Sequence, residues 1–132
     1  MGMFTVRVHV SNPAAPERRF AADFWVDTGA LYSLVPEDRL RQIGVEPLHT
    51  RLLILADGRR TQRPFGEARF TIDDLAETMT CPVVFGPPDA LYLLGATALE
   101  TFGVDADPTT KKLKPISAII GGFRAFTLPR NS

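Results

Sequence analysis

The chain lacks an excess of charge of either sign, because 15 Lys and Arg residues balance 15 Asp and Glu residues. This balance argues against a polycation that binds nucleic acid, and a hydrophobic content of 45% argues against a disordered chain. No apolar run approaches the roughly eighteen residues needed to cross a bilayer, so we expect no contact with a membrane. The composition predicts one soluble globular domain over residues 1–132, able to bury roughly 68% of its unfolded surface.

Cysteine and histidine are also scarce. The single cysteine, Cys81, excludes an intramolecular disulfide and every cysteine-based metal site, and its apolar surroundings favour a buried small hydrophobe over a reactive thiolate. His9 and His49 show no metal-ligand spacing, so we expect both at the surface and expect no metal or other cofactor. The N-terminus has no basic region followed by an apolar one, so we expect a reducing, cytoplasmic setting.

Alternating apolar residues and frequent turn residues predict short strands along most of the chain. The first two predicted strands cover residues 3–10 and 18–26, and a loop with two prolines separates them. Proline and acidic residues at the start and a glycine at the end predict a short helix over 36–44. The other predicted elements are strands over 51–56, 61–72, 78–85 and 92–95, a helix over 96–103, a hairpin over 105–115 and a last strand or pair of strands over 116–128. The fold class is therefore mainly β, with one or two short helices.

Residues 24–36 place one carboxylate, that of Asp27, in a tight turn between two apolar runs. The run before the turn predicts an interior strand, with Trp25 packed in the core. Gly29 lets the backbone bend sharply, the small Ala30 leaves space beside the carboxylate, and the Thr28 hydroxyl can donate to a nearby carbonyl. One interpretation is that Asp27 only caps the turn through a hydrogen bond to the backbone. The other is a carboxylate positioned for chemistry.

Four sequence elements, taken in order, resemble those of the retropepsin-like aspartic proteases, and of single-domain bacterial members in particular. Asp27-Thr28-Gly29-Ala30 with its apolar flanks resembles the active-site loop. Ala56-Asp57-Gly58-Arg59, at a hairpin tip, lies where the family has its flap. Leu93-Leu94-Gly95, followed by a helix, resembles the segment that packs across the loop, and the 105–115 hairpin fits the strands that follow in bacterial members. The resemblance implies a closed or partly open β-barrel of the acid protease type.

The chemistry of such a loop requires two carboxylates. One acts as base toward a water and the other as acid toward the carbonyl oxygen and the leaving nitrogen, and the close pair shares a proton. This chain has one Asp-Thr-Gly, because Asp73-Asp74 and Asp105-Ala106-Asp107 lack the apolar strand and the glycine. We therefore expect a symmetric homodimer that acts as an aspartic endopeptidase on peptides or proteins, with Asp27 of each chain as the catalytic residue.

The resemblance also implies roles for residues around the aspartate. Thr28 is expected to reach across the dimer axis to the partner loop, and Leu94 is expected to line the cleft together with the flap. Ala30 cannot donate a hydrogen bond to the carboxylate, as a serine could, so we expect activity at weakly acidic or near-neutral pH. The arginines at the flap tip either favour acidic peptides or only keep the hairpin soluble.

The C-terminal segment has two interpretations. Residues 117–132 extend past the recognisable pattern and are a possible dimer element, since terminal strands commonly build the dimer sheet in the family. Alternatively, the apolar residues of this region pack on the core of their own chain. These residues are Ile116, Ile119, Ile120 and Phe123.

Two other hypotheses stay open. The chain could be a catalytically inactive retropepsin-fold module that serves in dimerisation or peptide binding, with a hairpin that cannot close. It could also be monomeric as isolated and pair only in a larger complex or at higher concentration. An enzyme needs closure of the hairpin to exclude water and orient the peptide, so closure discriminates the first of these from a protease. The intact Asp27, Thr28 and Gly29 favour the enzyme.

Overall fold

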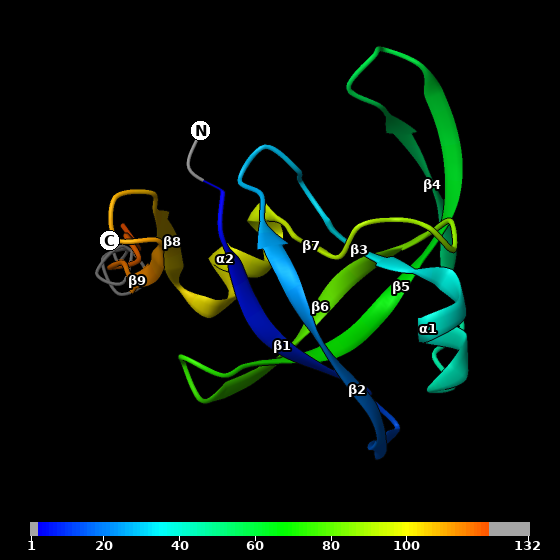
Figure 1. Cartoon of the computed structure of the whole chain (residues 1–132), viewed down its shortest axis with the longest axis horizontal. Helices are drawn as coiled ribbons and strands as arrows, with labels where there is room; N and C mark the ends of the chain where they lie inside the picture. Colours follow the sequence, from blue (N-terminus) through cyan, green and yellow to red (C-terminus); the bar gives the residue numbers. More distant parts are fainter. Residues whose placement is uncertain (1–2, 122–132) are drawn as a thin grey trace, which may run out of the picture.

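In the computed structural model, which describes residues 3–121, a seven-stranded sheet closes on itself because its first strand also pairs with its fifth. The strands follow one another in the sheet in the order β1-β2-β7-β3-β6-β5-β4 (Figure 1). Their bounds are β1 (Thr5–Asn12), β2 (Ala15–Val26), β3 (Ser33–Pro36), β4 (His49–Ile54), β5 (Arg60–Ile72), β6 (Glu77–Gly86) and β7 (Leu93–Leu94). The predicted β-barrel is thus confirmed.

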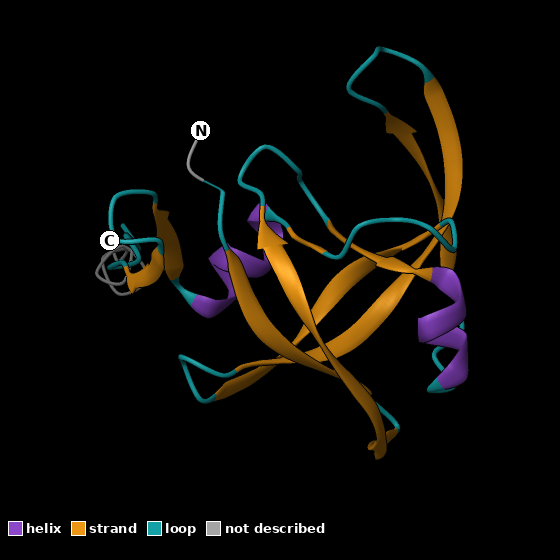
Figure 2. Ribbon diagram, viewed as in Figure 1, coloured by secondary structure: helices purple, strands orange, loops and turns teal. Residues whose placement is uncertain are grey.

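Two short helices and a small separate sheet complete the described part of the chain (Figure 2). The helices are α1 (Glu37–Gln42), directly after β3, and α2 (Ala96–Phe102), directly after β7. The second sheet is a hairpin of β8 (Val104–Asp107) and β9 (Lys112–Pro115). Both helices and this hairpin agree with the elements expected from the sequence.

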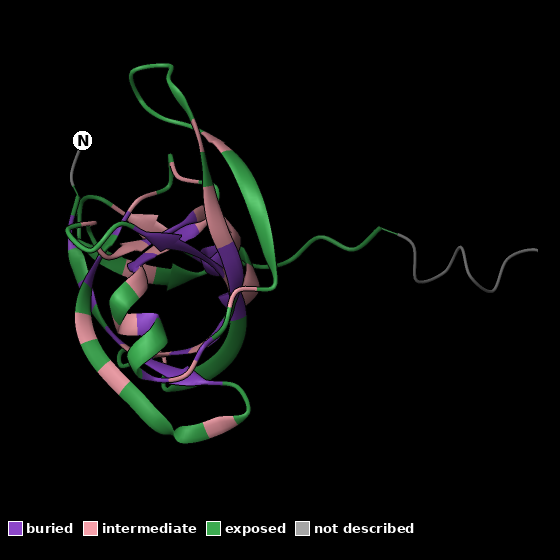
Figure 3. Ribbon diagram, turned by 90° about the vertical axis from the view of Figure 1, so that its right-hand side faces the viewer, coloured by how far each residue is buried: buried purple, intermediate pink, exposed green. Residues whose placement is uncertain are grey.

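The barrel interior is filled by side chains that alternate along the strands. Val6, Val8 and Val10 of β1 are buried, and the rings of Phe24 and Phe70 pack with centroids 5.7 Å apart. Full burial of such a side chain stabilises the fold by about 1.5–3 kcal/mol. Figure 3 shows the buried residues along the barrel strands and the exposed length of the β4–β5 hairpin, which extends beyond them.

The end of α1 is fixed by two side chains from the first hairpin. The Arg18 guanidinium donates to the Gln42 carbonyl and the Asn12 amide donates to the Ile43 carbonyl, both at 2.9 Å. These bonds satisfy carbonyls that a helix leaves without partners at its C-terminus. Gly44 follows with a φ of +81°, a conformation that favours glycine. The helix is thereby attached to the barrel at the end where it stops.

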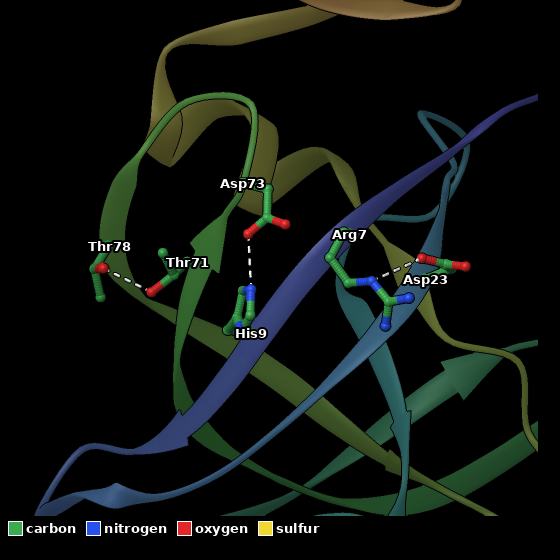
Figure 4. A network of polar contacts seen from close by, with 6 residues as sticks. All are labelled: Arg7, His9, Asp23, Thr71, Asp73 and Thr78. Atoms are coloured by element: carbon green, nitrogen blue, oxygen red, sulfur yellow. Dashed lines mark hydrogen bonds and ion pairs between the residues drawn. The ribbon is translucent and has the colours of Figure 1, made fainter.

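Polar contacts connect neighbouring strands on the outer surface of the barrel (Figure 4). Arg7 pairs with Asp23 at 3.2 Å and His9 pairs with Asp73 at 2.7 Å, all with partly exposed side chains. Such pairs contribute little to stability individually. His9 and the exposed His49 lie at the surface as predicted.

Three sequence predictions were wrong in detail. The expected loop over 11–16 is only a turn at 13–14, because the Asn12 side chain accepts a hydrogen bond from the Ala14 amide and closes a shorter hairpin. Trp25 is 39% exposed rather than packed in the core, since strand alternation turns it outward between Phe24 and Val26. Residues 116–121 carry no strand, and the rest of that predicted segment, including Phe123, lies outside the described residues.

Cys81 is fully buried in β6, as expected for a small hydrophobe. Burial raises the pKa of its thiol to about 12, which keeps the thiol protonated and unreactive at neutral pH. Within residues 3–121, no three His, Cys, Asp or Glu side chains gather as metal ligands. No helix in the same range is both long and apolar enough to cross a membrane.

Candidate active site

Asp27 lies where the chain leaves β2, and β7 fixes that point. β7 is inserted between β2 and β3, the two strands that the Asp27 loop connects, with Leu93 opposite both Trp25 and Leu34. The Asp27 amide donates to the Leu94 carbonyl at 3.0 Å. The segment 93–95 therefore packs against both ends of the loop.

The Asp27 side chain is half-buried and uses one carboxylate oxygen in the turn. The Gly29 amide donates to Asp27 Oδ1 at 3.0 Å, and the Ala30 amide donates to the Asp27 carbonyl at 3.2 Å. The turn-capping bond considered from the sequence is thus present. Among the described residues no hydrogen bond reaches Oδ2, so this oxygen is available to a water or substrate. A Cβ at Gly29 would lie 3.3 Å from Asp27 Oδ1, a tight contact that would shift the carboxylate by a few tenths of an ångström.

Gly95 is where the chain after β7 passes closest to the loop. A Cβ at this position would lie 2.5 Å from the carbonyl carbon and oxygen of Tyr32. The Gly95 amide donates to the hydroxyl of Ser33, a residue only 1% exposed, at 3.1 Å. Glycine allows the close approach, and the buried hydroxyl satisfies the glycine amide.

The N-terminus of α2 binds the other end of the loop. The Ala96 amide donates to the Ala30 carbonyl at 2.7 Å and the Thr97 amide donates to the Leu31 carbonyl at 2.9 Å. The first amides of a helix have no partner within the helix, so the loop carbonyls take the place of a capping side chain. The helix ends at Gly103, which has a φ of +67° as a left-handed C-cap. Loop and helix start therefore stabilise each other.

The predicted hairpin tip, Ala56 to Arg59, connects β4 and β5 and is exposed. Asp57 organises the tip, because its carboxylate accepts from the Arg59 amide at 3.0 Å and pairs with the Arg59 guanidinium at 2.6 Å. Gly58 has a φ of +86°, as turns of this kind require. The hairpin and the β2–β3 loop extend from the same side of the barrel in Figure 1, and within residues 3–121 no hydrogen bond joins the tip to the loop.

An open pocket of about 610 Å³ adjoins the loop. One wall is formed by the chain start and the loop itself, and the other by the β8–β9 hairpin. The lining residues are Met3, Phe4, Val26, Asp27, Thr28, Gly29, Asp105, Ala106 and Pro108. Thr28 is exposed beside this pocket, and its side chain makes no hydrogen bond to another residue of the described range 3–121.

Sequence reasoning missed two contributors to this site. Ser33 was not selected, although a small hydroxyl residue at the start of an apolar strand is a signal for a buried hydrogen bond. Asp105 was set aside for lacking the flanks of a catalytic loop, yet it lines the same pocket as Asp27. Its position depends on how α2 directs the following hairpin, which no local pattern reveals.

No protein-family model matches the sequence, and no curated protein matches it. Among solved structures, a retropepsin-like aspartic protease from Rickettsia conorii is similar over 85% of this chain and 88% of its own, with 22% identity and a TM-score of 0.55. The protease of simian foamy virus (mac) is similar over 74% of this chain and 92% of its own, with 18% identity and a TM-score of 0.52.

A third similar structure is the foamy viral protease-reverse transcriptase in complex with an RNA/DNA hybrid. It matches 88% of this chain, with 13% identity and a TM-score of 0.52, and this chain spans only about 13% of its length. The architecture is therefore a closed β-barrel shared with these solved structures. More specifically, the chain has a retropepsin-like fold.

Proposed function

We propose that this protein is an aspartic endopeptidase that acts as a symmetric homodimer. The observation that carries the proposal is the Asp27 loop, held at both ends by β7 and α2 on a retropepsin-like fold, with one carboxylate oxygen that accepts no hydrogen bond from residues 3–121. A loop that served only as a turn would not need bonds from a strand and a helix more than sixty residues later. The buried lone Cys81 supports a reducing compartment, which we propose to be the cytoplasm.

In the proposed mechanism the two Asp27 side chains share one proton. The ionised Asp27 of one protomer takes a proton from water as the water oxygen bonds to the peptide carbonyl carbon, while the partner's Asp27 protonates the carbonyl oxygen. When the carbon–nitrogen bond breaks, the nitrogen takes a proton from the first carboxyl group and the second regains its own. The products are a carboxylic acid and an amine, and the pair returns to its starting charge.

The pocket beside the loop supports the proposed pairing of two chains. Two carboxylates can share a proton only when the loops meet, so the partner's loop must approach Thr28 and Gly29. Both residues line the open pocket rather than being covered by their own chain. We place the two-fold axis there, where Thr28 can reach the partner loop.

Exposed apolar side chains near Asp27 support a peptide substrate. Trp25 and Asp27 are two residues apart on an extended segment, so they face the same side, and Leu93 lies beside Trp25 in register. Leu31, in the loop after β2, is 62% exposed, and Leu91, shortly before β7, is 59% exposed. We propose that these residues contact apolar side chains around the cleaved bond, with the β4–β5 hairpin as the flap that covers them.

The decisive experiment is cleavage of a peptide library by the wild-type protein and by Asp27→Asn, with molecular mass in solution measured for both. We expect a wild-type dimer that cleaves and an Asp27→Asn dimer slower by roughly 10²–10⁴-fold, the usual contribution of general acid–base catalysis. Asp73→Asn, which changes an exposed carboxylate that pairs with His9 and does not line the pocket beside Asp27, is the matched control and should cleave normally. Equal cleavage by wild type and Asp27→Asn would exclude the mechanism.

A peptide-binding module is the second candidate, because no hydrogen bond joins the hairpin tip to the Asp27 loop in the described residues. This alternative predicts that the wild-type dimer binds library peptides and leaves them intact. Binding is then measured by peptide pull-down with the same library. Cleavage by the wild type that is lost in Asp27→Asn excludes this alternative.

A further inference from the structure

The β4–β5 hairpin leaves the barrel at one point. β5 pairs with β6 from Phe65 to Ile72, but within residues 3–121 its first residues, Arg60 to Pro64, pair only with β4. No other strand in this described range supports the outer part of the hairpin. Its angle to the barrel depends on the contacts made near residues 63–65.

Arg63 connects the base of the β4–β5 hairpin to β6 and to α1. Its Nε donates to the Phe85 carbonyl at 2.8 Å, and its Nη2 lies 3.3 Å from Oε1 of Glu37. Glu37 belongs to the first turn of α1, which lies below the hairpin base in Figure 1. The two side chains are only 24% and 31% exposed, so solvent screens this ion pair less than it screens the pairs on the barrel surface.

Glu37 is the residue that offsets the charge of Arg63. The Nη2 atom is buried and makes no hydrogen bond within residues 3–121, so the nearby carboxylate supplies its compensation. Arg51 lies directly opposite Arg63 across the hairpin, and like charges in such positions destabilise a strand pair. The Arg51 guanidinium instead stacks on the Phe65 ring, 4.4 Å from its centroid. Without Glu37, two arginines would face each other, and one of them would have a buried Nη2 atom without a nearby carboxylate among the described residues.

The base of the β4–β5 hairpin also contacts the segment that follows Asp27. Arg63 and Phe65 lie on the same face of β5, two residues apart. The Phe65 ring packs edge-on against Tyr32, with centroids 4.8 Å apart. The backbone of Tyr32 also lies directly beside Gly95. The hairpin base, α1 and the active-site loop therefore meet in one cluster.

We propose that Glu37 and Arg63 are positioning residues that set the angle of the β4–β5 hairpin over Asp27. The pair holds the hairpin base against α1 and β6. The orientation of the base then sets the position of the outer hairpin. Loss of either charge releases the base and lets the hairpin open more often. The consequence for peptide binding rests on the proposed function, whereas the consequence for hairpin motion does not.

The first test measures hydrogen exchange of amides 49–63 in the full-length protein. The variants are Glu37→Gln, Arg63→Gln and the double variant, with Asp73→Asn as control because it removes a carboxylate from the His9 pair beyond the other end of β5 (Figure 4). We expect exchange roughly tenfold faster in each single variant and unchanged in the control. Glu37→Gln should add nothing when Arg63 is already replaced. Additive effects, or equal acceleration in the control, would overturn the proposal.

The second test measures kinetics on a library-derived peptide. We expect Glu37→Gln to raise KM roughly fivefold with kcat nearly unchanged, because a hairpin that opens more often weakens binding without touching the carboxylates. A general loss of stability would not give this split at temperatures where the variant stays folded. If the wild type cleaves and KM does not change, positioning is wrong and the protease assignment stands. If no peptide is cleaved, the protease assignment fails. The hydrogen-exchange experiment then still tests whether Glu37 and Arg63 hold the hairpin base.

Discussion

The Asp27 loop and the β4–β5 hairpin belong to the same proposed site but are held in opposite ways. The loop is bonded at both ends, to Leu94 on one side and to the first amides of α2 on the other. The hairpin is exposed along most of its length (Figure 3), and among the described residues its contacts with the barrel and α1 lie at its base. Segments with few buried contacts open at low free energy, whereas segments fixed from several elements open only with the whole fold. The Asp27 carboxylate is thus fixed in position, whereas the β4–β5 hairpin is free to move.

The largest effect should come from the glycine that packs on the loop. Gly95→Ala places a methyl group 2.5 Å from the Tyr32 backbone, so the loop or β7 must shift. We expect the free energy of unfolding to fall by about 3 kcal/mol, measured by urea denaturation. An Ala98→Gly variant in the adjoining helix is the control, because it changes one buried methyl group without a clash and should lose only about 1–2 kcal/mol, from helix propensity and lost burial. Unchanged stability in Gly95→Ala would show that the loop is not held as described.

Ser33→Ala tests the buried hydrogen bond to the same glycine. The change leaves the Gly95 amide buried without a partner, and we expect a loss of about 1–3 kcal/mol in the free energy of unfolding. Removal of the Thr71 hydroxyl by Thr71→Val is the matched control, because its bond to Thr78 is exposed. If both variants lose the same small amount, the bond to Gly95 has no special role in holding the loop.

Gly58→Ala makes the corresponding change in the β4–β5 hairpin. This glycine also has a restricted conformation, with a φ of +86°, but no atom lies within 4 Å of an added Cβ. We expect a loss of about 1 kcal/mol from backbone strain alone, and a measured change in hydrogen exchange confined to the hairpin. A loss as large as that of Gly95→Ala would mean that the hairpin and the loop are coupled more closely than their contacts indicate.

Asp107→Ala should have the smallest effect and depends on pH. The amides of Thr109 and Thr110, in that order, hold the pKa of the Asp107 carboxyl below its usual value. A carboxyl whose pKa is lowered by folding stabilises the protein above its unfolded pKa and loses that contribution as pH falls through the folded value. We expect Asp107→Ala to lower Tm slightly at pH 7, and we expect this difference from the wild type to shrink as the pH falls below the usual pKa of an aspartate. A difference that grows on acidification contradicts this assignment.

The sequence predicted the strands because period-2 alternation survives wherever a strand has one face inside, as in β1, whereas the closure into a barrel was implied only by the resemblance of four motifs. It predicted the ends of α2 and the hairpin tip because Gly103 and Gly58 sit where positive φ is needed. It failed at Trp25, where an apolar run was interpreted as a doubly buried strand although one face is open. Local pattern could not indicate the bond between Ser33 and Gly95, since it joins residues 62 positions apart.

The bonds between the loop and the start of α2 also have a consequence for the order of events during synthesis. The carbonyls of Ala30 and Leu31 meet their donors only after residues 96 and 97 have left the ribosome. A nascent chain that ends before that point carries the Asp-Thr-Gly sequence without the partners that shape it. Because such long-range contacts form late in folding, the proposed protease can gain its active geometry only when most of its chain has been made.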